Sequence, residues 1–152
     1  MPVGTPAEIS RIRRGLTDLA GMSRNAARLI SILDKCKRVF TIDIGSNGDH
    51  FGTDKNGNEN GSNITWDPSR DHIKDGSEPW HYRPPEIGLG HELVHAWIAA
   101  TNVALVGKTW TEQLGYEEWG VTGATRRNGL PNGNFEFNEN NFRRECRLRQ
   151  QP

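Results

Sequence analysis

Apolar residues in the first part of the chain recur at intervals of three and four, which is the spacing of one helix face. From Pro6 to about Ala20 they alternate with arginines, and a second series follows Ser23, a residue type that caps helix N-termini. These apolar positions are Ile9, Ile12, Leu16 and Leu19, then Ala26, Leu29, Ile30 and Leu33. We therefore expect two amphipathic helices, one ending at Gly21 and the other at about Cys36.

The pattern changes to strict alternation over residues 38–45. Phe40, Ile42 and Ile44 fall on one face of an extended chain, and Thr41 and Asp43 fall on the other. Alternation of this kind, in β-branched and aromatic residues, predicts a strand with one buried face.

Residues 45–69 are rich in Gly, Asn and Asp, with Asn-Gly pairs at 47–48, 56–57 and 60–61. Asn and Gly both tolerate positive φ, so these pairs favour tight hairpin turns. Asn63 to Trp66 is predicted to be a short strand that ends before Asp67-Pro68. This strand could be an edge strand that pairs with an extended substrate peptide, or an inner strand whose two edges are already paired. The sequence leaves both arrangements open.

The run from Glu86 to Asn102 is strongly apolar and begins after Pro85, which cannot lie inside a helix. We expect a helix from there to about Asn102. Further helical patterns cover residues 111–123 and 138–150. Several helices with a few strands, and no β-α-β rhythm, predict an α+β domain.

Length and charge narrow the class of protein. A chain of 152 residues with 34% hydrophobic residues is enough for one domain over residues 1–152, in which residues 1–22 would be a peripheral N-terminal helix. The 19 basic and 19 acidic side chains cancel, so no overall field favours nucleic acid or an anionic membrane as a partner.

The sequence contains no apolar run long enough for a membrane span, and its first residues lack the apolar region of a Sec signal peptide. Cys36 and Cys146 lie far apart without a Cys-x-x-Cys pattern. We expect two free thiols rather than a disulfide.

The apolar run contains the pattern His-Glu-x-x-His, at His91, Glu92 and His95. Residues four apart lie on one face of a helix, so both imidazoles can reach one zinc ion. Glu92 would project beside the metal and act as general base and then general acid in hydrolysis. Gly88 and Gly90 would leave room near the metal for backbone or substrate. Two ordinary histidines remain the alternative, but buried imidazoles on an apolar helix need a partner, which favours zinc.

A catalytic zinc takes three protein ligands and keeps one position open. Downstream of His95 the chain has no further histidine, so we expect a carboxylate as the third ligand. Glu117 and Glu118 are the candidates, with Glu112 weaker and Glu136, Glu139 and Glu145 further away. Physical reasoning alone does not choose between the paired glutamates.

Three segments, "GHELVHAW", "EEWGVTG" and "NENNFRRECRLRQQP", resemble the zinc metallopeptidase effector family of bacterial pathogens. That family resembles gluzincins, and its relatives include toxin domains of bacterial polymorphic toxins. Its pattern falls here on His91 to His95, on Glu117-Glu118 with Val121, and on Glu139-Asn140 with Arg143. The resemblance covers roughly residues 60–152.

The resemblance implies a zincin-like domain: a His-Glu-x-x-His active-site helix, a small, mainly antiparallel sheet and flanking helices. It implies one catalytic Zn²⁺ and makes Glu118 the third ligand, since a small residue, here Val121, stands three positions later; Glu117 stays an alternative. The implied partner is a protein substrate, with host signalling proteins among the targets. The implied location is the cytosol of a target cell, reached through a specialised bacterial secretion system, and we expect a monomer.

Two other functions remain open. A zinc ion could only stabilise the fold of a non-catalytic binding module, although Glu92 would then have no use and a structural site normally has four protein ligands. A zinc hydrolase acting on a non-peptide bond is the other alternative.

Further residues have two interpretations each. Tyr82 or Tyr116 could stabilise the oxyanion of the reaction, or simply pack in the interior. The basic C-terminal cluster could be a solvated helix face or a dock for an acidic segment of substrate; its residues are Arg143, Arg144, Arg147 and Arg149.

Overall fold

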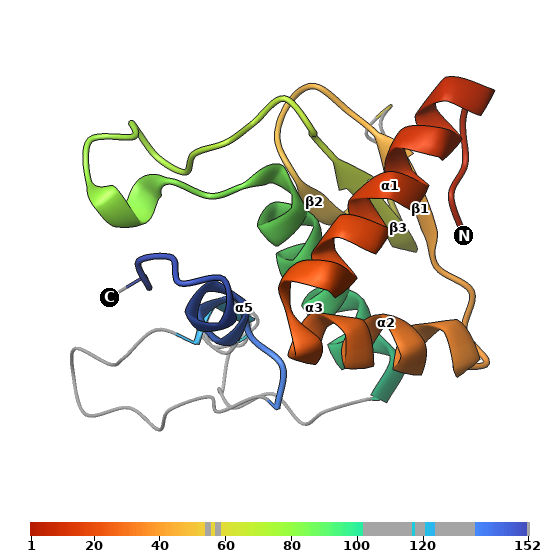
Figure 1. Ribbon diagram of the computed structural model, residues 1–152. Helices are drawn as coiled ribbons and strands as arrows, with labels where there is room; N and C mark the ends of the chain where they lie inside the picture. The colour runs from red at the N-terminus through yellow and green to blue at the C-terminus, as the bar shows by residue number, and fades with distance from the viewer. Residues whose placement is uncertain (54–55, 57–58, 102–116, 118–120, 124–135, 152) are drawn as a thin grey trace, which may run out of the picture.

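The described part of the chain contains helices and a small three-stranded sheet, which confirms the α+β class (Figure 1). The structure is a computed structural model that describes residues 1–53, 56, 59–101, 117, 121–123 and 136–151. Within these ranges the α-helices are α1 (Pro6–Met22), α2 (Arg24–Lys35), α3 (Pro85–Thr101) and α5 (Glu139–Glu145). A 3-10 turn, η1 (Pro79–His81), precedes α3. The helix expected over residues 111–123 lies largely outside the described residues.

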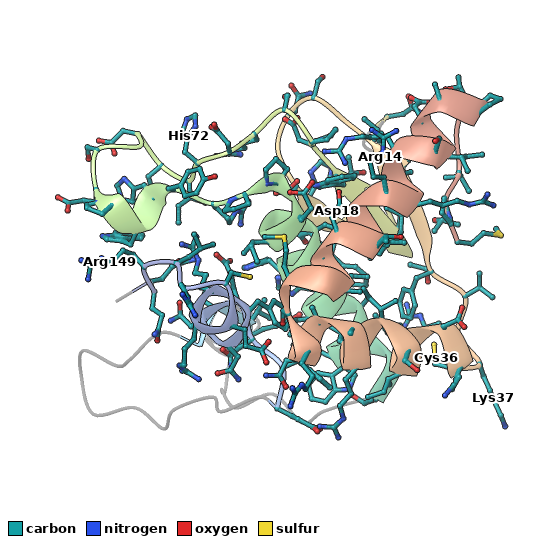
Figure 2. All side chains as sticks on the ribbon, in the orientation of Figure 1. Arg14, Asp18, Cys36, Lys37, His72 and Arg149 are labelled. Atoms are coloured by element: carbon teal, nitrogen blue, oxygen red, sulfur yellow. The ribbon has the colours of Figure 1, made fainter. Side chains whose placement is uncertain are left out.

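The two N-terminal helices form where the apolar spacing predicted them. Thr5 and Glu8 make a reciprocal capping box at the start of α1, and Ser23 accepts a hydrogen bond from the Ala26 amide at the start of α2. Ile12 and Leu19 are fully buried, so α1 contributes directly to the core. Its solvent face carries Arg14 and Asp18 (Figure 2).

The sheet has the order β1-β3-β2, with β1 (Thr41–Ile44) parallel and β2 (His50–Thr53) antiparallel to β3 (Glu59–Trp66). It is therefore a mixed sheet, and the expectation of a mainly antiparallel one is wrong. The strand at Asn63–Trp66 is the inner strand, so its two edges are already paired. We expected only turns at β2, which has no clear alternation of its own and depends on its pairing with β3.

Helix α3 runs through the middle of the molecule, and it contacts α1, α2, α5 and two of the strands (Figure 1). This position explains why the helix is apolar on nearly all sides: it has no broad solvent face. Gly90 allows this close packing, because a Cβ there would lie 3.1 Å from the Phe142 ring and 3.4 Å from Leu19. The space at Gly90 thus serves the core and not a substrate, contrary to our expectation.

Helix α5 is shorter than the predicted 138–150 and fastens the C-terminal part to the rest of the chain. Asn138 caps its first turn. Glu145, at its other end, accepts hydrogen bonds from the Ser23 hydroxyl and from the Asn25 amide, and so caps α2 from 120 residues away. The Asn140 side chain bonds the backbone of Gln151 through both its oxygen and its nitrogen.

Both cysteines are free, as expected. Cys36 follows the last turn of α2 (Figure 2), and the Cys146 thiol lies 3.5 Å from the Met22 carbonyl oxygen. Burial raises the pKa of the Cys146 thiol, with a further contribution from the nearby Glu145 charge. Among the helices that the structure describes, none combines the length and the hydropathy needed to cross a membrane.

Candidate metal centre

His91 and His95 lie one turn apart on the same face of α3, with ring centroids 5.1 Å apart. The Nε2 atoms of the two rings face each other at 3.3 Å. His91 is 6% exposed and the His95 side chain 14%, so both rings are largely removed from water.

The other ring nitrogens each contact a carboxylate. Nδ1 of His91 lies 2.8 Å from Oε2 of Glu139, and Nδ1 of His95 lies 2.8 Å from Oε1 of Glu117. A carboxylate only accepts hydrogen bonds, so the proton of each neutral ring belongs on Nδ1. The Nε2 atoms then carry lone pairs that point toward the same space.

This geometry fits a zinc site. Two nitrogens bound to a tetrahedral zinc ion at about 2.0–2.1 Å are separated by about 3.3 Å, and the observed separation of the Nε2 atoms is 3.3 Å. Two lone pairs at this distance repel unless a cation or a proton lies between them. Carboxylates on the outer nitrogens are the usual second layer of contacts around metal-binding histidines. The two rings are thus arranged as metal ligands would be.

Glu92 shares the burial of the two rings. It is 5% exposed and directly follows His91 in α3. A carboxylate at this depth is poorly solvated, which favours a role in proton transfer over a role in solubility.

The third predicted ligand, Glu118, lies outside the described residues. Its neighbour Glu117 is described, and its carboxylate is on the Nδ1 side of His95, away from the space between the Nε2 atoms. Val121, the small residue three positions after Glu118, is fully buried in the core. The described residues contain no group of three His, Cys, Asp or Glu side chains placed to hold a metal, so His91 and His95 are a candidate pair of ligands without a described third one.

Glu139 is a residue of the site that sequence reasoning treated as remote. It is fully buried, and its Oε1 accepts hydrogen bonds from Nε of Arg143 at 2.6 Å and from Gln151 at 2.8 Å. Burial alone would raise the pKa of Glu139, but the hydrogen bond and charge of His91 and the charges of Arg83 and Arg143 lower it to about 2. Its signal in the sequence was the i,i+4 spacing of Glu139 and Arg143.

A strand forms one wall beside His95. The Phe51 ring of β2 stacks on the His95 ring, with centroids 6.2 Å apart and planes inclined by 9°. Phe51 also contacts Phe40, so the imidazole rests on an aromatic cluster that limits its rotation.

The basic C-terminal cluster is not a uniform solvated face. Arg143 is fully buried, and its Nη1 donates to the carbonyl oxygens of Trp80, Tyr82 and Arg149. Interpreting Arg143 as a solvated residue is therefore wrong, because three carbonyls and Glu139 surround its guanidinium. The remaining arginines, Arg144, Arg147 and Arg149, are exposed.

The other candidates lie elsewhere. Tyr116 is outside the described residues, and Tyr82 is 53% exposed, so an oxyanion role for either stays a prediction. His72 lies on the loop before η1, away from α3 (Figure 2), and contacts Asp71. His81, in η1, contacts Asp75.

Comparison with known proteins gives one match. The model of the Peptidase_M91 family, described as "Effector protein", matches residues 14–152. The match begins within α1 and so extends further than the resemblance over residues 60–152. No curated protein and no solved structure matched the chain.

Proposed function

The chain belongs to the Peptidase_M91 family of effector proteins, and on that premise we propose that it is a zinc-dependent endopeptidase. His91, His95 and Glu118 would hold one zinc ion, and Glu92 would be the general base. The substrate class is protein, as the peptidase family implies.

One observation carries this proposal: the Nε2 atoms of His91 and His95 are 3.3 Å apart while each Nδ1 contacts a carboxylate at 2.8 Å. Each contact leaves the lone pair on Nε2, and the separation suits two ligands of one tetrahedral ion. A proton shared between the rings would also satisfy the pair, and metal analysis distinguishes the two cases.

Glu118 as the third ligand rests on the position of its neighbour. Because Glu117 contacts Nδ1 of His95, it is engaged on the side of the ring that faces away from the proposed ion. Glu118, the other member of the pair, is the proposed ligand because the resemblance implies a ligand Glu with a small residue, here Val121, three positions later.

The chemistry divides between the ion and the chain. A bound zinc ion would supply Lewis acidity, which acidifies water and polarises a carbonyl group. Glu92 would take the proton of the attacking water and pass it to the leaving amine. The burial of Glu92 limits competing hydrogen bonds from bulk water. Glu117, Glu139 and the Phe51 ring would orient the two imidazoles.

The finer identity of the substrate is also proposed. An effector acts outside the cell that makes it, so we infer delivery into a target cell and cleavage of a host or competitor protein there, with host signalling proteins as the first class to examine. We further propose that the protein works as a monomer.

Zinc content and one isosteric variant test this function. Protein purified without chelator should contain about one equivalent of zinc. Glu92→Gln should retain the metal. Cells that express the wild type should contain new protein termini from cleavage, and cells that express Glu92→Gln should lack them. Glu86→Gln is the matched control, because Glu86 lies on the same helix but pairs with Arg11. Less than about half an equivalent of zinc in the wild type, or identical termini with Glu92→Gln, would refute the proposal. Zinc retained with no protein cleavage at all would favour a stabilising metal or a non-peptide substrate.

A further inference from the structure

A chain of buried charges continues from His91 away from the proposed metal position. Oε2 of Glu139, which contacts Nδ1 of His91, lies 3.6 Å from Nη1 of Arg83. Nη2 of Arg83 binds Oδ2 of Asp49 at 2.7 Å. The side chains of Asp49, Arg83 and Glu139 are 1%, 10% and 0% exposed. The order of contacts is therefore Asp49, Arg83, Glu139, His91.

The two oxygens of Glu139 have different partners. Arg143 and Gln151 contact Oε1, whereas His91 and Arg83 contact Oε2. Arg143 and Gln151 therefore fix the carboxylate within the C-terminal part of the chain. Arg83 is placed to fix the oxygen that faces His91.

Asp49 is itself held firmly. Its Oδ1 accepts a hydrogen bond from the Asp67 amide at 2.8 Å. A Cβ on Gly88 would lie only 2.3 Å from Oδ2 of Asp49, so α3 has a glycine where this carboxylate crosses the helix. The space at Gly88 is thus occupied by Asp49. Burial raises the pKa of Asp49, and the hydrogen bond from the Asp67 amide and the Arg83 charge both oppose this rise.

We propose that Arg83 and Asp49 are positioning residues for His91: they hold Oε2 of Glu139 against Nδ1 and thereby fix the ring tautomer and the direction of the Nε2 lone pair. The effect on metal affinity rests on the proposed zinc function, but the effect on the tautomer does not. Neither residue touches the reacting atoms. Their contribution passes through Glu139 to the ring.

The test compares Arg83→Gln with Arg11→Gln. Both changes remove an arginine that is ion-paired to a carboxylate on or beside α3, but the Arg11–Glu86 pair, at 3.2 Å, lies outside the series of contacts from Asp49 to His91. In the metal-free wild type, ¹⁵N NMR of the His91 ring at fixed pH should show one tautomer, protonated on Nδ1. Arg83→Gln should give a mixture of tautomers, Arg11→Gln should not, and Arg83→Lys should restore the single tautomer in part.

Zinc affinity and thermal unfolding complete the experiment. Loss of an outer partner of a metal-binding histidine typically weakens binding by about 10–100-fold, and we expect this for Arg83→Gln but not for Arg11→Gln. Thermal unfolding of the metal-free proteins shows whether the two variants are destabilised equally. If Arg83→Gln fails to fold, Asp49→Asn takes its place, since its Oδ1 can still accept the Asp67 amide.

The outcomes separate this inference from the proposed function. A single unchanged tautomer in Arg83→Gln overturns the positioning role, whatever the metal affinity. Equal losses of zinc affinity in Arg83→Gln and Arg11→Gln also overturn it, because the effect would then be general destabilisation. A shifted tautomer in a protein whose wild type binds no zinc supports positioning and refutes the zinc function.

Discussion

Glu117 contacts His95 at Nδ1, with 2.8 Å between the two atoms. In an imidazole ring Nδ1 and Nε2 point in different directions, and Nε2 of His95 points toward His91. Glu117 is therefore placed to orient His95 and not to share a metal ion with it. The pair Glu117-Glu118 would then divide two tasks between adjacent residues.

This division predicts different results for the two alanine variants. Glu118→Ala should lose zinc on dialysis, because a ligand is removed. Glu117→Ala should keep zinc with an affinity lowered by about 10–100-fold, the usual cost of losing a partner of a ligand. Competition with a chromogenic chelator measures both affinities. The reverse order, with Glu117→Ala the more damaging, would assign Glu117 as the ligand.

Zinc should stabilise the fold. A ligand at 100 times its dissociation constant adds about 2.7 kcal/mol to the free energy of unfolding, which is about 5–11 °C in Tm for a domain of this size. Differential scanning fluorimetry of chelator-treated protein, with and without zinc, measures the shift. Glu92→Gln should show the full shift and His95→Ala none. An equal shift in His95→Ala would place the binding elsewhere.

Glu145→Ala should destabilise the protein by about 1 kcal/mol, because α2 loses the carboxylate that caps its first turn. Denaturant unfolding measures the change. Arg144→Ala, at the exposed neighbour, should stay within about 0.5 kcal/mol of wild type. A double-mutant cycle of Ser23→Ala with Glu145→Ala should give non-additive losses, and additive losses would mean that the two side chains act independently.

Two glycines of α1 should respond oppositely to alanine. A Cβ on Gly15 would lie 2.4 Å from the ring of Trp66, which is fully buried and bonded through its indole nitrogen to the Pro85 carbonyl oxygen. Gly15→Ala should therefore cost about 1–3 kcal/mol. At Gly21 a Cβ would meet nothing within 4 Å, so Gly21→Ala should stabilise the helix by about 0.4–1 kcal/mol. Urea unfolding of both variants measures the two changes in the free energy of unfolding. Equal changes would contradict the packing at Gly15.

The helices could be predicted because their signals are local. Ser23 and the apolar spacing around Leu29 define α2 without any knowledge of the rest of the chain. The same is true of the His91 and His95 spacing, which the structure keeps on one helix face. Strand β2 could not be predicted, because its pairing partner, β3, decides its conformation.

Contacts between residues that are far apart in the sequence could not be predicted either. Glu139 is 48 residues from His91, and Asp49 is 34 residues from Arg83. The i,i+4 spacing of Glu139 and Arg143 predicts that they pair, but it does not predict that the pair is buried, because a charged residue is exposed in most proteins. Arg143 was misread for the same reason: charge alone predicts a solvated face, whereas three backbone carbonyls converge on this guanidinium.

The contact between His91 and Glu139 also affects the order in which the protein folds during its synthesis. Contacts between residues far apart in sequence form late in folding, because a long loop must close first. A chain truncated before residue 139 would contain the whole His-Glu-x-x-His helix and still lack the carboxylate that orients its first histidine. The His-Glu-x-x-His motif is thus completed by a helix that follows it in the chain, so a nascent chain that ends before this helix would carry the motif without the carboxylate partner of His91.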